Sequence, residues 1–222
     1  MSEGDGKRKT EMLFCSGNVG KYELLLKYTR HISNISIVQN KELNIIEPQL
    51  NTAEEIALHK ANYAYKKLKQ PIIVHDGALI IKELKDFPGP YTKYVSQTIG
   101  CTGILKLLDG VADRSSALIG CLVFVDENGK SHIFTDPEQP EWGKYWGKIA
   151  HLHENNKMTG DIYNWSSGNP NENLYNIFVP VNIPGNEKPL TQFSDDEITH
   201  LQMCIKSCYQ DFANWLENNY KR

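Results

Sequence analysis

The stretch from residue 71 to 95 constrains the fold of this chain more than any other. It opens with the apolar run 72–74, bounded by a proline, which predicts a short buried strand ending just before Asp76. Ligands of α/β sheets gather at the carboxyl ends of strands, so an acid there is a site candidate. A proline-rich turn at 88–91 then presents Lys93, and an acid and a lysine near backbone breaks suit an anionic ligand with its metal. Taken alone, the stretch fits an ordinary strand, a surface acid and a loop equally well.

Apolar periodicity along the rest of the chain predicts strands that alternate with helices early and form a hairpin later. The predicted strands cover residues 12–15, 35–38, 117–125, 132–135 and 176–181, and the predicted helices cover 21–28, 53–69, 99–108 and 194–218. Thr52 precedes Glu55 by three residues, which is typical of a capping box at the start of the second helix. This order predicts an α/β fold with a mixed sheet. Because no linker interrupts it, we expect one domain of two lobes over 11–222, preceded by a disordered polar tail over 1–10.

The composition of this 222-residue chain is that of a soluble globular protein, with 40% hydrophobic and 23% charged residues. A net charge of −3 makes duplex nucleic acid a poor partner, so an acidic substrate would need a local group of lysines. No apolar run approaches the length of a membrane span, and the polar N-terminus does not have the pattern of a signal peptide. Five scattered cysteines predict reduced thiols and a cytoplasmic location.

A turn between the first predicted strand and the first predicted helix offers a second anion-binding feature. It contains Ser16, Gly17, Asn18 and Lys21. Such a turn gathers free backbone N–H groups at the positive end of a helix, where they bind phosphate oxygens. It does not have the glycine spacing of a Walker loop, and many strand–helix turns contain Gly and Asn for steric reasons alone. Lys60, in the middle of the second predicted helix, has small apolar neighbours, although most helical lysines face water.

Two groups of metal-ligating side chains are weaker candidates. Cys204 and Cys208 lie four residues apart in a helical pattern and would share one face, but a zinc site there needs further ligands nearby. His151 and His153 open a region rich in Asn, Gly and Ser that extends to residue 173. We expect reduced thiols, solvated histidines and an excursion or lid over 151–173.

Three motifs in the first half of the chain resemble those of the inosine triphosphate pyrophosphatase family. Residues 16–21, Ser-Gly-Asn-Val-Gly-Lys, resemble the family's phosphate loop, and residues 55–61 resemble its Glu-Ile-Ala-x-x-Lys-Ala helix. Residues 74–79, followed by Pro-Gly-Pro-Tyr-Thr-Lys at 88–93, resemble its acidic strand end and turn, which are the most specific match. The resemblance is firm from residue 11 to 125 and fades beyond.

The resemblance implies a fold, a reaction and a set of site residues. The family's fold is a long mixed β-sheet with flanking helices, in two lobes around a central cleft and usually as a homodimer. Its members hydrolyse non-standard purine nucleoside triphosphates such as ITP, dITP and XTP to the monophosphate and pyrophosphate with Mg²⁺, and Mn²⁺ is an alternative ion. Asp76 matches the catalytic acid, which also binds the metal, and Glu47 is the best match for a second metal ligand. Phosphate binding is implied for Ser16, Gly17, Asn18, Lys21, Lys60 and Lys93.

The sequence departs from the family pattern mainly around the base. His75 replaces an acid, and Gly77 replaces a hydroxyl residue. The family's base-binding segment is reduced to a stretch containing Tyr175 and Asn176, where an amide replaces the carboxylate that reads the base. Near the C-terminus, His200 matches a Ser-His-Arg motif without its Arg. We therefore expect Tyr175, Asn176 and His200 to bind the base with altered selectivity.

Two other interpretations stay open at this point. The chain could be a catalytically impaired family member that acts as a nucleotide-binding or protein-interaction module. The Trp-Gly-Lys triplets at Trp142 and Trp146 could instead form a surface that docks a protein or single-stranded nucleic acid by stacking, although core aromatics are commoner.

Overall fold

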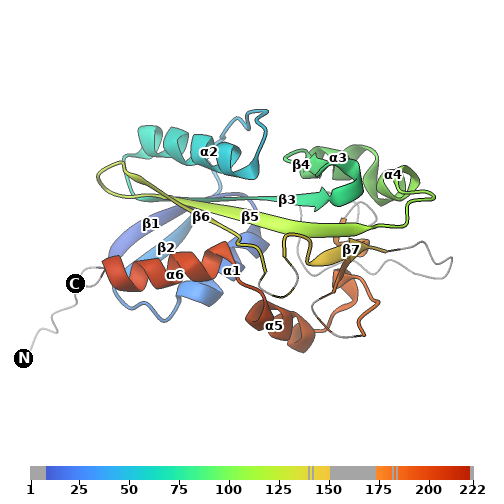
Figure 1. The fold of residues 1–222 in the computed structure, drawn as a ribbon. Coiled ribbons are helices and arrows are strands. Elements are labelled where there is room, and N and C mark those ends of the chain that lie inside the picture. Colours follow the sequence, from blue (N-terminus) through green and yellow to red (C-terminus); the bar gives the residue numbers. More distant parts are fainter. Residues whose placement is uncertain are drawn as a thin grey trace, which may run out of the picture.

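A mixed β-sheet extends through the part of the chain that the structure, a computed structural model, describes: residues 9–139, 141, 143–150, 174–181, 183 and 185–220 (Figure 1). Its strands are β1 (Thr10–Cys15), β2 (Ile35–Asn40), β3 (Ile72–Ile81), β4 (Pro88–Gly89), β5 (Ser115–Val125), β6 (Ser131–Thr135), β7 (Gly147–Ile149) and β8 (Phe178–Pro180). The helices are α1 (Val19–Thr29), α2 (Ala53–Leu68), α3 (Thr92–Thr98), α4 (Gly100–Leu107), α5 (Asp195–Cys204) and α6 (Cys208–Asn219). Short 3-10 helices cover Lys82–Leu84, Leu174–Asn176 and Leu190–Gln192.

The sheet combines a parallel half with an antiparallel half. Its main strand order is β2-β1-β3-β5-β7-β8, with β4 paired to β3 and β6 paired to β5. Strand β1 pairs in parallel with both β2 and β3. The pairs β3–β5, β5–β7 and β7–β8 are antiparallel. The predicted α/β class with a mixed sheet and flanking helices is therefore confirmed.

Helices cover both faces of the sheet, with α2, α3 and α4 on one side and α1, α5 and α6 on the other (Figure 1). Helix α2 begins with the predicted capping box, in which Thr52 and Glu55 bind each other's backbone N–H groups. Its small residues Ala57, Ala61 and Ala64 are fully buried in a cluster with β3 and β5. Alanines allow the helix to lie close to the sheet, and this proximity brings Lys60 within reach of β3.

The opposite face of the sheet is held by aromatic packing. Phe14 on β1, Phe124 on β5 and Phe212 on α6 are all fully buried in one cluster with α1. The rings of Phe124 and Phe212 lie 5.6 Å apart, and Trp215 lies 5.8 Å from Phe124. Such pairs add to the free energy gained from apolar burial. A further cluster joins α4, α5, β7 and β8 to the other end of β3 and β5.

Strand β3 is longer than the sequence predicts, and this changes the position of Asp76. The apolar run at 72–74 does not end a strand: β3 continues to Ile81 because β5 pairs with it along its whole length. Asp76 consequently lies in the middle of β3. However, β1 pairs with β3 only through Leu13–Ile72 and Phe14–Ile73. Asp76 therefore lies just beyond the carboxyl end of β1, beside the turn that follows it.

The predicted long C-terminal helix is wrong, because two helices with a break between them occupy this region. Helix α5 ends where Ile205 becomes extended, and Ser207 caps α6 by accepting the N–H of Gln210. The side chain of Gln139 fixes the break by accepting the N–H of Lys206 at 2.8 Å and donating to its carbonyl oxygen at 3.0 Å. The break also separates the two neighbouring thiols, since Cys204 is exposed and Cys208 is buried.

Several sequence predictions fall on residues outside the described ranges. Outside these ranges lie the tail over 1–8, Trp142 and the region 151–173 with its two histidines. The predicted tail over 1–10 is too long at its end, because β1 begins at Thr10. Trp146 is buried in the core, which argues against a stacking surface at this position. In the described part of the chain, no helix has the length and apolar character required to cross a membrane.

The aromatic cluster should dominate the stability of the sheet. Replacing Phe124 with Ala removes a fully buried ring, so we expect the free energy of unfolding to fall by about 3–5 kcal/mol. Urea denaturation measures this change. The matched control is Ile133→Ala on β6, whose side chain is 40% exposed, and it should cost less than about 1 kcal/mol. Equal losses for the two variants would contradict the packing described above.

Candidate functional site

A polar cleft of about 440 Å³ lies where the turn after β1 meets β3, α2 and α3. Every residue that the sequence assigns to metal or phosphate lines it: Ser16, Gly17, Asn18, Lys21, Glu47, Lys60, Asp76 and Lys93. These residues come from five separate segments of the chain. The structure thus brings the phosphate and metal candidates of the sequence into one cleft.

The turn after β1 is held in place by its own side chains. The N–H of Asn18 donates to Ser16 Oγ at 3.1 Å, and the N–H of Lys21 donates to Asn18 Oδ1 at 2.9 Å. Asn18 is thereby the N-cap of α1. Gln39 on β2 donates its side-chain amide to the carbonyl of Ser16 at 2.8 Å, which fixes the turn against the sheet. Gly17 has no neighbour within 4 Å of the place where a Cβ would be, so its backbone is open to a ligand.

Two carboxylates converge on one lysine in the cleft. Lys60 Nζ lies 2.8 Å from Glu47 Oε1 and 3.4 Å from Asp76 Oδ2. Although burial lowers the pKa of Lys60, the charges of Asp76 and Glu47 raise it above its ordinary value. Burial would raise the pKa of Glu47, but Lys60 holds that pKa below its ordinary value. Lys60 therefore stays charged and keeps the Glu47 carboxylate ionised beside Asp76.

Lys21 adds a second cation at the inner end of the cleft. Burial lowers its pKa, and the nearby charge of Lys60 lowers it further, while Asp76 raises it. A poorly solvated cation gains more from a nearby anion than one that faces water. Lys93 on α3 is exposed on the other side of the cleft. Together these lysines give the cleft the local positive charge that the acidic chain as a whole does not have.

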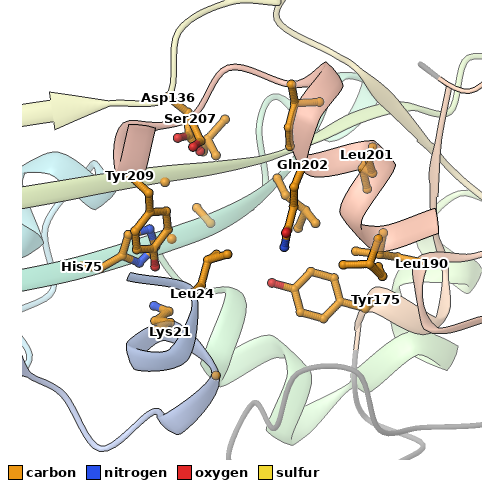
Figure 2. Close-up of a pocket in the computed structure, with 18 of the residues that line it drawn as sticks. Lys21, Leu24, His75, Asp136, Tyr175, Leu190, Leu201, Gln202, Ser207 and Tyr209 are labelled. Carbon is orange, nitrogen blue, oxygen red and sulfur yellow. The ribbon is translucent and has the colours of Figure 1, made fainter. Parts of the chain in front are cut away.

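A second, mainly apolar cavity of about 170 Å³ lies beside the cleft, on the other face of β3 (Figure 2). The two hollows share Asn18, Lys21, His75 and Gly77 as lining residues. In Figure 2, Lys21 and His75 lie on one side of the cavity and Tyr175 on the opposite side. A ligand with a charged part and a flat apolar part could therefore extend from the cleft into the cavity.

His75 forms part of the wall between the two hollows. Its side chain is only 8% exposed, and its ring stacks on Tyr209 with centroids 4.7 Å apart and planes at 15°. Burial lowers its pKa well below the ordinary value, and Lys21 and Lys60 lower it further, so the imidazole is neutral. The structure thus places an uncharged, stacked ring where the family pattern has an acid.

The three residues that the sequence assigns to the base differ in whether they line the cavity. Tyr175 lines the cavity, whereas Asn176 is buried next to it and is not among the lining residues. His200 is exposed on α5, where its Nε2 lies 3.6 Å from Cys204 Sγ, and it does not line the cavity.

Two residues that line the cavity were not predicted from the sequence. Asp136 follows β6, and Tyr209 lies in the first turn of α6. A signal for Tyr209 was present, because Ser207 followed by Gln210 is a pattern for the start of a new helix. No such signal marked Asp136, which is brought to the cavity by the pairing of β6 with β5.

The donor set of the cleft suits a hard divalent cation. Glu47 Oε1 and Asp76 Oδ2 both bind Lys60 Nζ, so the two carboxylates can reach a common cation. The described residues contain no group of three or more His, Cys, Asp or Glu side chains that could hold a metal ion alone. Mg²⁺ is commonly bound by one or two carboxylates together with substrate phosphates and waters, which fits this arrangement.

Comparisons with known proteins find a matching family model and relatives that cover most of this chain. The model of the Ham1 family matches residues 12–162 of this chain. The chain is 30% identical over 214 residues to a dITP/XTP pyrophosphatase of Methanopyrus kandleri, covering 94% of this chain and 97% of that protein. It is 30% identical over 210 residues to a dITP/XTP pyrophosphatase of Thermococcus kodakarensis, covering 95% and 99%.

Solved structures share the fold at low sequence identity. A HAM1 protein from Coxiella burnetii matches with a TM-score of 0.69 at 19% identity, covering 94% of this chain and 99% of that chain. The Staphylococcus aureus Ham1 protein matches with a TM-score of 0.68 at 18% identity, covering 94% and 99%. At this identity the likeness supports the fold and leaves the chemistry to the residues of the site.

The ion pair between Lys60 and Glu47 can be tested directly. Replacing Lys60 with Met removes the cation that holds the pKa of Glu47 low, so we expect the carboxyl of Glu47 to titrate at a higher pH than in the parent. Carbon-detected NMR of the labelled side-chain carboxyl measures this pKa. The matched control is Lys148→Met, which breaks an exposed pair with Glu187 and should leave the Glu47 pKa as it is. An unchanged Glu47 titration in Lys60→Met would show that the pair does not form in solution.

Proposed function

This chain belongs to the Ham1 family, and on that premise we propose that it is a nucleoside triphosphate pyrophosphatase. We propose that it converts non-standard purine nucleoside triphosphates, of the ITP, dITP and XTP type, to the monophosphate and pyrophosphate. The printed names of its full-length relatives, dITP/XTP pyrophosphatases, support this substrate class. The resemblance drawn from the three sequence motifs is confirmed by the family match.

One observation carries the proposal. The partly buried Lys60 binds both Glu47 and Asp76, and this cluster lies in the same cleft as the N-cap turn of α1. Backbone N–H groups at a helix start, several lysines and two carboxylates are the groups that a triphosphate with its cation requires. We assign phosphate binding to Ser16, Gly17, Asn18, Lys21, Lys60 and Lys93.

The proposed hydrolysis requires a group that accepts a proton from water and groups that stabilise negative charge on the phosphate oxygens. A water molecule attacks the α-phosphorus, and its oxygen forms a bond there while the bond from that phosphorus to the bridging oxygen breaks. Asp76 orients this water and takes its proton, and pyrophosphate leaves with the electron pair. Lys21 and Lys60 stabilise the negative charge that develops on the phosphate oxygens. A cation held by Glu47 and Asp76, when bound, supplies further charge neutralisation on the triphosphate.

The apolar cavity is the place for the nucleoside in this proposal. It adjoins the cleft through Asn18, Lys21 and His75, so a nucleotide with its phosphates in the cleft would extend its nucleoside into the cavity. Tyr175 is the residue implied by the resemblance that is placed to contact the base. Base recognition by Asn176 and His200 would need a rearrangement of the positions described above.

A catalytically impaired family member is the second candidate. The observation that favours it is His75, which gives the site a neutral ring in place of a second acidic side chain next to Asp76. Nucleotide binding without turnover would support this alternative.

Three finer assignments belong to the same proposal. We propose Mg²⁺ as the working cation, with Mn²⁺ as a substitute, because the two carboxylates are oxygen donors. A homodimer and a cytoplasmic location are proposed on the family resemblance and the reduced thiols. Size-exclusion chromatography with light scattering would measure the oligomeric state.

Turnover should depend on Asp76. In Asp76→Asn the site keeps its shape but loses the group that accepts the proton, so we expect kcat to fall by roughly 10²–10⁴-fold. Pyrophosphate release from ITP and XTP in the presence of Mg²⁺ measures this change. The matched control, Asp113→Asn, breaks an exposed pair with Lys82 and should turn over like the parent.

Two outcomes would contradict the proposal. The parent protein could release no pyrophosphate from any purine triphosphate, or Asp76→Asn could turn over at the parental rate. Calorimetric titration with ITP then separates the second candidate, which predicts binding, from a protein that does not bind nucleotides.

A further inference from the structure

Gln39 is a polar side chain on the face of β2 that helix α1 covers. Successive residues of a strand point to opposite faces, so Gln39 shares a face with Ile35 and Ile37. Both isoleucines are buried in one cluster with Leu25 of α1. The hydroxyl of Tyr22 on α1 donates to the carbonyl of Ile37 at 2.9 Å. The alternation along β2 therefore places Gln39 beside the start of α1, two residues beyond this contact.

The side-chain amide of Gln39 donates to two carbonyl groups in the turn after β1. Its Nε2 lies 2.8 Å from the carbonyl oxygen of Ser16 and 3.4 Å from that of Asn18. Because both partners are carbonyl oxygens, which only accept, the NH₂ end of the amide is the end that faces them. Gln39 is not among the residues that line the cleft or the cavity. It can therefore act on a ligand only through this turn.

The hydrogen bond to Ser16 determines the direction of the next backbone N–H. The peptide unit between Ser16 and Gly17 is planar and trans, so its C=O and its N–H point in opposite directions. Since the carbonyl is held toward Gln39, the N–H of Gly17 points away from Gln39. Gly17 itself lines the cleft, and nothing lies within 4 Å of the place where its Cβ would be.

The N–H of Gly17 differs from its neighbours in having no acceptor. The N–H of Asn18 donates to Ser16 Oγ, and the N–H of Lys21 donates to Asn18 Oδ1. No residue in the described part of the chain accepts a hydrogen bond from the N–H of Gly17. A backbone N–H without an acceptor, at the edge of a cleft that several lysines line, suits a phosphate oxygen.

We propose that Gln39 is a positioning residue for phosphate binding, which holds the Ser16 carbonyl so that the N–H of Gly17 donates to a phosphate oxygen of the substrate. This inference rests on the proposed function, because it requires a triphosphate in the cleft. If the peptide between Ser16 and Gly17 rotated, its carbonyl oxygen would face the phosphate and repel it. A donor that is held in place before the ligand binds contributes more, because no reorientation is needed.

The test removes the hydrogen bonds that Gln39 donates. Gln39→Leu keeps a side chain of similar size that cannot donate, so we expect the Kd for inorganic tripolyphosphate with Mg²⁺ to rise by roughly tenfold or more. Gln39→Glu places a carboxylate against the Ser16 carbonyl, and its Kd should rise at least as much. Isothermal titration calorimetry measures both values. Because tripolyphosphate carries no nucleoside, the change reports phosphate binding alone.

The matched control is Asn186→Leu. Asn186 Nδ2 also donates to two backbone carbonyls, those of Pro180 at 3.0 Å and Lys188 at 3.2 Å, but Asn186 is not among the residues that line the cleft or the cavity. Its replacement should leave the Kd for tripolyphosphate as in the parent. Thermal unfolding checks that each variant is folded, which separates a loss of affinity from a general loss of structure.

The amide signal of Gly17 gives a readout that does not depend on the variants. In ¹H–¹⁵N NMR spectra of the parent, this signal should move downfield when tripolyphosphate binds, because the N–H gains a charged acceptor. In Gln39→Leu saturated with tripolyphosphate, the shift should be smaller. A Gly17 signal that stays in place in the saturated parent would overturn the inference, even if neither variant of Gln39 folds.

The inference and the proposed function fail in different ways. Tripolyphosphate Kd values within about threefold for the parent and Gln39→Leu would overturn the role of Gln39. Release of pyrophosphate from ITP by the same parent would then leave the proposed function intact. A parent that neither hydrolyses ITP nor binds tripolyphosphate would contradict both. If the parent hydrolyses ITP but its Kd for tripolyphosphate is too high to measure, equal kcat/KM values for ITP in the parent and Gln39→Leu would overturn the role.

Discussion

The pairing of Lys60 with Glu47 and Asp76 is the interaction on which the rest of the site depends. It joins a helix, a loop and the middle of a strand, and it places two carboxylates within reach of one cation. The small alanines of α2 make this possible, because they let the helix lie close to β3. A lysine with two acidic neighbours keeps its own charge and keeps Glu47 ionised, and these charges are the ones that the proposed binding of a triphosphate with its cation requires.

Strand β3 lies between the polar cleft and the apolar cavity. Successive side chains of a strand point to opposite faces of the sheet, so Asp76 lines the polar cleft, whereas His75 forms part of the wall that the cleft shares with the apolar cavity. In the proposed function, β3 would therefore lie between the triphosphate in the cleft and the nucleoside in the cavity. On the cavity side, the break before α6 brings Tyr209 against His75, and the loop after β6 brings Asp136 to the same cavity.

The sequence predicts the residues that meet in the polar cleft, whereas of the three residues it assigns to the base only Tyr175 lines the apolar cavity. Ser16 to Lys21 and the Lys60 helix are local motifs, whose function depends on a turn and a cap that neighbouring residues determine. The sequence identifies Asp76 as a site candidate but predicts too short a strand before it. The pairing that extends β3 comes from β5, which is far away in the sequence. The helix break at Ile205 was missed because periodicity continues through it, while the hydrogen bonds that fix it come from Gln139.

We propose that the cleft directs water to the α-phosphorus of a triphosphate. The most direct test is to hydrolyse ITP in water enriched in ¹⁸O and to locate the label by mass spectrometry. We expect ¹⁸O to enter the nucleoside monophosphate and the released pyrophosphate to carry none. Label in the pyrophosphate, or in inorganic phosphate released from the γ-position, would place the attack on another phosphorus and contradict the role given to Asp76 and its lysines.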